Sequence, residues 1–302
     1  MRNVGLIVTL VLGACGGEQP VTNAPGGSGS GGGSGDGSSD GGSAATSTAG
    51  GTGAATSQGG NQAAGGGGEQ PVDLDGDGID DGVEAALALA YLPFISLHPD
   101  DECTRHGVIY RLSPHPDEPS YDMIWYDVLY ESDCGLNGHI GDNETFSVVI
   151  DPEVPAPAGI VAVRAISHEG TVCQQVTTCG SLAGCDACAT ADKRGVAFPI
   201  VFSSKNKHGG YVDEGTCDLS VICDFGGCAI GTFAEPALVN VGEPNAPLVS
   251  DLTAEGFIND ANGWTESALM NYDPWGGADF GDAGNVAGDL DDAAMVVSPG
   301  GC

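Results

Sequence analysis

The cysteines constrain the fold most strongly, because nearly all of them fall in the part of the chain that carries the large apolar side chains. The sequence has 11 cysteines, and every one except Cys15 lies between residues 103 and 302. In an exported protein such a set predicts structural disulfide bonds, although the sequence does not determine which cysteines pair. The candidates are Cys103, Cys134, Cys173, Cys179, Cys185, Cys188, Cys217, Cys223, Cys228 and Cys302.

One pair, in Cys185-Asp186-Ala187-Cys188, has a spacing that also occurs in zinc sites and redox centres. In an oxidising compartment a structural disulfide is the favoured interpretation of this pair, with a metal or redox role as the alternative.

The N-terminus has the pattern of an export signal. Arg2 precedes an apolar core, Val4 to Leu12, that is too short to span a bilayer. The following Leu12-Gly13-Ala14-Cys15 resembles the lipobox of bacterial lipoproteins, in which the cysteine is diacylated and becomes the new N-terminus. The resemblance implies that residues 1–15 are a lipoprotein signal peptide and that Cys15 carries the lipid. An ordinary signal peptide with a chance cysteine is the alternative.

Residues 16–72 consist mostly of glycine, serine, alanine and threonine. A segment of this composition buries too little apolar surface to offset its chain entropy, so it is expected to be a disordered linker. The lipoprotein resemblance, with Gly16 after the cysteine, implies lipid anchoring in the bacterial cell envelope, at the outer membrane or cell surface. The membrane is therefore an expected partner through the anchor.

The charge of the chain narrows the classes of ligand. The sequence has 42 acidic and 8 basic residues, for a net charge of −34. Such a polyanion repels nucleic acid, so no nucleic-acid partner is expected. Acidic residues favour divalent cations instead, although much of this charge also serves solubility.

Residues 73–84 match a calcium-binding loop, D-x-D-x-D-G-x₅-E. Calcium takes six to eight oxygen ligands, so several short carboxylates must converge from one tight loop. The expected ligands are the side chains at loop positions 1, 3, 5, 9 and 12 and the backbone carbonyl at position 7: Asp73, Asp75, Asp77, Asp81, Glu84 and Ile79. The loop resembles the calcium repeats of thrombospondin type 3 and of bacterial surface proteins, which implies a structural clamp. A hydrophilic linker end that binds nothing is the alternative.

A helix from about Asp81 to Leu92 is expected to follow the loop and to end at Pro93, so that residues 73–93 form the calcium-binding unit. Beyond it, residues 94–302 read as a disulfide-rich antiparallel β-sandwich, because short apolar runs alternate with turn residues. The expected strands are Val108–Leu112, Tyr121–Tyr130, Thr145–Ile150, Ile160–His168, Val196–Ser203, Leu219–Cys223 and Ala237–Val241.

A second candidate cation site lies in GHIGDNETF, residues 138–146, where an apolar run begins. Residues two apart on a strand share a face, so Asp142 and Glu144 point the same way and His139 reaches them from the preceding turn. Two such carboxylates repel each other unless a cation lies between them, and no basic residue is close in the sequence. The pattern therefore predicts a second divalent cation, Ca²⁺ or Mg²⁺; solvated turn acids are the alternative.

These residues resemble a known heptapeptide. Gly-His-x-x-Asp-x-Glu is similar to the Gly-His-Arg-His-Asp-Trp-Glu of the necrosis- and ethylene-inducing-like proteins, and to proteins related to vacuolar protein sorting 62. The resemblance implies a β-sandwich in which His139, Asp142 and Glu144 bind a cation with one upstream acid. Asp133 is the preferred upstream acid, ahead of Glu131 and Asp127.

Scattered motifs extend the resemblance across about Tyr91 to Gly281. They are Tyr91-Leu92-Pro93-Phe94 with His98-Pro99, Lys207-His208-Gly209-Gly210-Tyr211, Asn240-Val241-Gly242-Glu243 and Pro274-Trp275-Gly276. Gly141 replaces the second histidine of the heptapeptide and Asn143 replaces its tryptophan, so the plant-membrane lysis typical of the first family does not carry over.

The sequence thus favours an exported protein that binds a glycan or lipid headgroup through a cation. The main alternative is a metal-dependent hydrolase in which His139, Asp142 and Glu144 activate water. The absence of a clear second general base argues against catalysis, and an independent histidine, His208 or His168, would favour it. A purely structural surface protein with structural cations is the third interpretation. Separately, the acidic tail at residues 279–292 is expected to be a solvated loop, with a further calcium site as the alternative.

Overall fold

The computed structural model describes residues 72–103, 106–169, 171–220, 223–232, 235–252, 257, 272–276, 280 and 289–302. All of them belong to one compact unit, Gly66–Cys302. The predicted signal peptide with Cys15, and the predicted linker up to residue 71, lie outside the described residues. Within the described residues, no helix combines the length and the apolar character needed to cross a bilayer.

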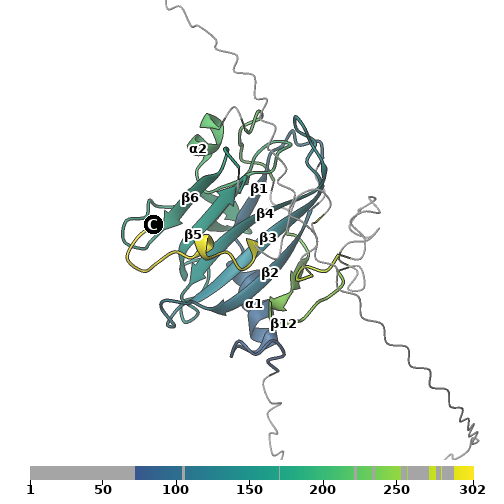
Figure 1. Ribbon diagram of the computed structural model, residues 1–302. Helices are drawn as coiled ribbons and strands as arrows, with labels where there is room; N and C mark the ends of the chain where they lie inside the picture. The colour runs from purple at the N-terminus through teal and green to yellow at the C-terminus, as the bar shows by residue number, and fades with distance from the viewer. Residues whose placement is uncertain are drawn as a thin grey trace, which may run out of the picture. The chain divides into compact units, whose positions relative to one another are not determined.

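The larger of two main sheets has six strands in the order β10-β2-β3-β4-β5-β6 (Figure 1). Its neighbours pair antiparallel except at one edge, where β10 runs parallel to β2. The strands are β2 (His106–Pro114), β3 (Asp122–Ser132), β4 (Ile140–Ile150), β5 (Ile160–Ser167), β6 (Gln175–Gly180) and β10 (Leu238–Asn240).

The second sheet is smaller and packs against the inner face of the first. In this sheet β8 pairs with β1, β7 and β9, and the β1–β8 pair is parallel. Its strands are β1 (Phe94–Leu97), β7 (Thr190–Lys193), β8 (Val196–Ser203) and β9 (Gly210–Tyr211), and a separate hairpin joins β11 (Gly242–Glu243) to β12 (Ala246–Pro247). The short helices are α1 (Asp81–Tyr91), α2 (Glu214–Leu219) and the 3₁₀ helix η3 (Ala293–Met295).

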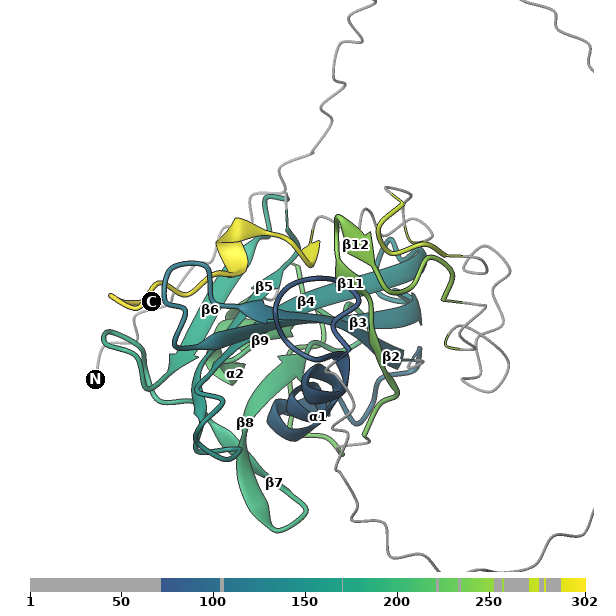
Figure 2. The same cartoon turned by 90° about the horizontal axis from the view of Figure 1, so that it is seen from below.

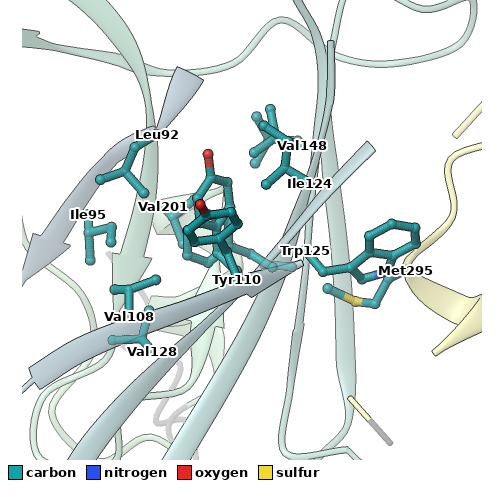
Figure 3. Close-up of a cluster of buried hydrophobic side chains, with 14 of the residues drawn as sticks. Leu92, Ile95, Val108, Tyr110, Ile124, Trp125, Val128, Val148, Val201 and Met295 are labelled. Carbon is teal, nitrogen blue, oxygen red and sulfur yellow. The ribbon is translucent and has the colours of Figure 1, made fainter. Parts of the chain in front are cut away.

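Strand alternation places one apolar core between the two sheets. Figure 3 shows Val201 of β8 and Ile95 of β1 on one side, with Val108 and Val128 of the larger sheet on the other. The helix α1 closes one end of this core, where the Tyr126 hydroxyl donates to the Ala88 carbonyl at 2.7 Å. Residues before the first strand are therefore part of the sandwich core.

The outer face of the larger sheet is covered by the C-terminal segment, residues 289–302, drawn in yellow in Figures 1 and 2. Trp125 points outward from β3 and lies beside Met295 of η3 (Figure 3). The Ser147 hydroxyl donates to the Met295 carbonyl at 2.7 Å, and Arg164 donates to the Val296 carbonyl at 2.7 Å. Side chains on both faces of β3 and β4 are thus buried.

The mainly β fold is confirmed, although β1, β6, β7, β9, β11 and β12 were not among the expected strands. Three further differences are found. Two pairs, β1–β8 and β10–β2, are parallel, because alternation determines which face a residue occupies and not the direction of the strand. The strand expected at Leu219–Cys223 is wrong at its described residues, because Leu219 ends α2 and neither Ser220 nor Cys223 lies in a strand; residues 221 and 222 lie outside the described residues. The Asp213 side chain caps this helix by accepting from the backbone N–H groups of Gly215 and Thr216. Finally, β4 begins at Ile140, five residues before the expected start.

All ten cysteines of the domain are paired, as the even count predicted. Cys185 and Cys188 bond to different partners, so Cys-x-x-Cys is neither a redox pair nor half of a zinc site. The bonds are Cys103–Cys134, Cys173–Cys223, Cys179–Cys188, Cys185–Cys302 and Cys217–Cys228.

We predict that thiol titration of the denatured, unreduced protein finds no free cysteine other than Cys15. Peptide mapping without reduction should recover a peptide that joins the segment around Cys185 to Cys302. A peptide in which Cys185 is bonded to Cys188 would contradict this connectivity.

Candidate cation sites

The acidic loop that precedes α1 brings its carboxylates together as its spacing predicts. Ligand atoms of Asp73, Asp75 and Asp81 lie within 4.8 Å of one another, and so do those of Asp75, Asp77 and Glu84. The two groups share Asp75, so the five predicted side chains converge on one region. Calcium, which prefers several carboxylate oxygens, fits this donor set.

Several of these carboxylate oxygens are buried without any hydrogen-bond partner. They are both oxygens of Asp75, Oδ2 of Asp77 and Oε1 of Glu84. Burial and the charge of Asp77 raise the pKa of Asp75 to about 6. Burial and the charges of Asp75 and Asp77 raise the pKa of Glu84 to about 8. A buried carboxylate without a partner is costly, and a bound cation would remove that cost.

The loop is also tied to the sandwich. Glu84 lies on α1, is completely buried, and accepts a hydrogen bond of 2.5 Å from the Asn240 amide of β10. Asp80 caps the helix, accepting from the N–H groups of Gly82 and Val83. The Ile79 N–H donates to Asp77 Oδ1 at 2.7 Å. The role of the Ile79 carbonyl as a ligand stays a prediction.

The second candidate site lies where β4 begins. Asp142 faces Tyr130 and Glu144 faces Val128 across the β3–β4 pair, so both acids point to the inner face of the larger sheet, as predicted. Gly141 has a φ of 74° at a bulge in this pairing. The bulge extends β4 through the polar residues that the sequence presents as a turn.

Asp142 has a protein partner from a distant part of the chain. His208 stacks on Tyr130 with 3.8 Å between ring centroids, and its Nδ1 lies 2.7 Å from Asp142 Oδ2. Its Nε2 lies 3.4 Å from Asp101 Oδ2. Burial alone would lower the pKa of His208, but the hydrogen bonds to Asp101 and Asp142 and their negative charges raise it to about 9.

Asp133 and His139 form a second group beside the first. His139 Nδ1 lies 2.7 Å from the Gly141 carbonyl, and its Nε2 lies 3.7 Å from Asp133 Oδ2. Lys207 forms an ion pair with Asp133. Among the described residues, no set of ligand atoms within 4.8 Å joins His139 to Asp142 and Glu144. The four-residue cation site therefore stays a prediction.

Glu144 lies two residues further along β4 on the same inner face. Its Oε2 is 3.4 Å from the backbone N–H of Gly210. Burial, with the charges of Asp142 and Asp224, raises the pKa of Glu144 well above its usual range. Asp224 is itself satisfied, because it accepts hydrogen bonds from Tyr211 at 2.5 Å and from Ser204, and lies 3.0 Å from His168.

Three members of this network were not assigned a role from the sequence: Asp101, Lys207 and Asp224. Lys207 and His208 belong to the Lys-His-Gly-Gly-Tyr stretch, which is one of the motifs behind the family resemblance. That motif is the feature of the sequence that could have placed both residues near the cation site. Asp101 and Asp224 stand in loops between other acids, with no spacing that distinguishes them. A third group of possible metal ligands consists of Asp101, Cys103 and His208. Cys103 cannot bind a metal as a thiolate, because it forms a disulfide bond with Cys134.

Comparisons with known proteins add the following. No protein-family model matches the chain, and no curated protein matches it. One similar solved structure is "Toxin fold for microbial attack and plant defense", with 16% sequence identity, coverage of 76% of this chain and 93% of that chain, and a TM-score of 0.35. A second is "NLPPya in complex with glucosamine", with 15% identity, coverage of 76% of this chain and 93% of that chain, and a TM-score of 0.35. A third is "Crystal structure of non-toxic HaNLP3 protein", with 13% identity, coverage of 76% of this chain and 94% of that chain, and a TM-score of 0.34. At these identities and TM-scores the likeness assigns no function to this chain.

We predict that calcium stabilises the protein through the loop before α1. For a Kd of about 10⁻⁴ to 10⁻³ M, calcium at ~100 times Kd should add about 2.7 kcal/mol to the free energy of unfolding. Glu84→Gln should remove one ion from the stoichiometry measured by calorimetry and should reduce the calcium-dependent rise in melting temperature.

Asp80→Asn is the matched control for this measurement. Asp80 caps α1, and asparagine is an equally good capping residue, so this variant should keep the full calcium response. Equal stoichiometry and affinity in the wild type and the Glu84→Gln variant would contradict the loop assignment.

We further predict a pH dependence that comes from His208. Its folded-state pKa, about 9, lies above the value of 6.5 for an unperturbed histidine. Its stabilising contribution is therefore complete below pH 6.5 and is lost as the pH rises through 9. The shift corresponds to roughly 3 kcal/mol.

His208→Asn should flatten this decline in denaturant titrations, because asparagine does not ionise and tolerates the φ of 56° at this position. His98→Asn, at a histidine outside the inner-face network, should keep the decline. An unchanged slope in His208→Asn would show that the imidazole is neutral.

Proposed function

We propose that this chain is an exported, lipid-anchored protein whose β-sandwich binds a glycan or a lipid headgroup through a divalent cation at the start of β4. The observation that supports the proposal is the placement of Asp142 and Glu144 on the inner face at the start of β4, where Glu144 has no basic partner among the described residues. A second observation supports a ligand at the same end, because an open cavity lies beside Asp133.

This cavity has a volume of about 430 Å³ and is lined by Cys134, Gly135, Leu136, Lys205, Asn206, Lys207, Phe225 and Gly226. Lys205 and Lys207 are two of only 8 basic residues in a chain with a net charge of −34. Leu136 and Phe225 are both 64% exposed. Lysine and amide groups suit hydroxyl or phosphate oxygens, and an exposed aromatic ring suits the apolar face of a sugar.

The cation would compensate the charge that the protein leaves unbalanced. His208 already neutralises Asp142, and Lys207 pairs with Asp133. Glu144 is left with one backbone N–H and no basic partner among the described residues. Calcium or magnesium held by Glu144 and Asp142, with His139 and Asp133 turned towards it, would supply the missing charge and offer a free position to a ligand oxygen.

The loop before α1 would hold a calcium ion as a structural clamp, and residues 16–72 would tether the domain to a lipid on Cys15. Cys15→Ser should release the protein from the membrane fraction or block its processing. Membrane fractionation of a fully processed Cys15→Ser variant would overturn the anchor assignment.

His208 and His168 are the two candidates for a general base, and their contacts favour binding over catalysis. His208 is held between Asp101 and Asp142, and His168 lies 3.0 Å from the buried Asp224. Neither histidine faces the cavity lined by Lys205 and Lys207. A metal-dependent hydrolase at this site would require one of them to be released as a general base.

The test uses the full chain with Cys15→Ser, so that the lipid does not itself bind membranes. Binding to a glycan array and to vesicles that contain anionic phospholipid is measured in calcium, in magnesium and in chelator. Glu144→Gln should abolish cation-dependent binding, while Asp117→Asn, at an exposed turn, should leave it unchanged. Chelator-resistant binding in the wild type would overturn the cation-dependent proposal, and metal-dependent turnover of a phosphoester or glycoside would favour the hydrolase.

A further inference from the structure

The outer face of the larger sheet, like the loop before α1, contains buried carboxylate oxygens that have no hydrogen-bond partner. Asp127 in β3 is completely buried, and neither of its carboxylate oxygens has a hydrogen-bond partner. Asp127 faces Thr145 across the β3–β4 pair, whereas Asp142 faces Tyr130. Because the side chains of a strand alternate, Asp127 lies on the face opposite to Asp142 and Glu144.

The C-terminal segment brings further acids to Asp127. The Asn143 amide, on the same outer face as Thr145, donates to Asp289 Oδ2 at 2.5 Å. Asp292 caps η3 through Oδ1, which accepts from the Ala294 N–H at 2.8 Å, while its buried Oδ2 has no partner. The Thr145 hydroxyl is also buried without a partner. Asn143 therefore links Asp289 to the face of the sheet that carries Asp127 and Thr145, but the carboxylates of Asp127, Asp289 and Asp292 are not among the described groups whose ligand atoms all lie within 4.8 Å of one another.

The charges of these acids act on one another. Burial and then the charge of Asp289 raise the pKa of Asp127 well above its usual range, while Thr145 and Asn143 lower it. Burial and the negative charges of Asp292 and Asp289 raise the pKa of Glu169, which follows β5, to about 7. The carboxylates therefore repel one another and lack a positive partner.

The nearest basic side chains are engaged elsewhere. Arg111 forms ion pairs of 2.8 Å with Glu243 and 2.6 Å with Asp291. Arg164 donates to backbone carbonyls of the C-terminal segment. Within the described part of the chain, no lysine or arginine bonds to Asp127, Asp289 or Asp292. The burial of Asp127 therefore needs another source of positive charge or a bound proton.

We propose that Asp127, Asp289 and Asp292, with the side-chain oxygens of Asn143 and Thr145, bind a calcium ion that fastens the C-terminal segment to the outer face of the sheet. Every donor in the set is an oxygen, which favours a hard cation over zinc or copper. The ligands come from β3, β4 and a segment more than a hundred residues later in the chain. Binding would thus join the tail to the sheet, independently of the loop before α1 and of the inner-face site.

The site borders a cavity of about 230 Å³ that Arg111, Trp125 and Asp292 help to line. Trp125 is two residues from Asp127 on the same face, and Asp292 belongs to both the cavity and the proposed site. The ion would therefore fix one wall of this cavity. Without the ion, the repulsion between Asp127 and Asp289 would favour displacement of the segment.

The test measures calcium binding by calorimetry in a Glu84→Gln background, which removes the ion of the loop before α1. Asp127→Asn should weaken or remove one remaining ion, with a Kd raised about tenfold or more, because calcium affinity depends on the number of charged ligands. Asp289→Asn, in the less deeply buried tail, should do the same and serves if Asp127→Asn does not fold. Asp291→Asn is the matched control, since Asp291 pairs with Arg111, and it should leave the ion in place.

Hydrogen exchange supplies a second readout at the tail itself. Calcium should slow the exchange of residues 289–302 in the Glu84→Gln background and should have no such effect once Asp127→Asn is added. If Asp127 instead carries a proton, asparagine mimics that state. Unchanged calcium stoichiometry and unchanged tail protection in both Asp127→Asn and Asp289→Asn would therefore overturn the proposal.

Discussion

A carboxylate can be buried only if its charge is compensated, and this constraint organises most of the polar structure of the domain. The chain compensates part of this charge with its few basic groups: Lys207 at Asp133 and His208 at Asp142. Other buried acids have no such partner within the described residues, notably Glu84 and Asp127. A chain with 42 acidic and 8 basic residues cannot supply a basic residue for each acid. A divalent cation can balance the charge of two carboxylates at once.

The strand pair β3–β4 is where these acids gather, because both faces of the pair are covered. On the inner face the second sheet brings His208 and Gly210 to Asp142 and Glu144. On the outer face the C-terminal segment brings its own acids to Asp127. A central strand pair buried on both sides would ordinarily be apolar throughout. In this protein both faces of β3–β4 carry acids. At these acids the second sheet and the C-terminal segment contact the strand pair through charged groups as well as through apolar packing.

Local features of the sequence predicted local features of the structure. The helix α1 was predicted to within one residue, because its acidic first turn and the proline after it are both adjacent in the chain. Alternation likewise predicted that Asp142 and Glu144 share a face. The start of β4 was missed because a bulge at Gly141 carries the strand through residues that are typical of a turn.

What sequence could not predict depends on residues that meet only after folding. His208 reaches Asp142 from 66 residues away, and Asp289 reaches Asn143 from 146 residues away. No spacing rule connects such residues, so the sequence predicted a cation beside Asp142 and did not show that His208 would pair with this acid. The parallel pairs β1–β8 and β10–β2 were missed for the same reason.

The Cys185–Cys302 disulfide has a consequence for how the outer face of the larger sheet is covered. Its two cysteines are separated by 117 residues, a longer separation than in any of the other four bonds. The bond fixes the far end of the C-terminal segment to the loop that follows β6. Reduction of this one bond would therefore free that end of the segment, which lies beside Trp125, while the bonds within the sandwich stay closed.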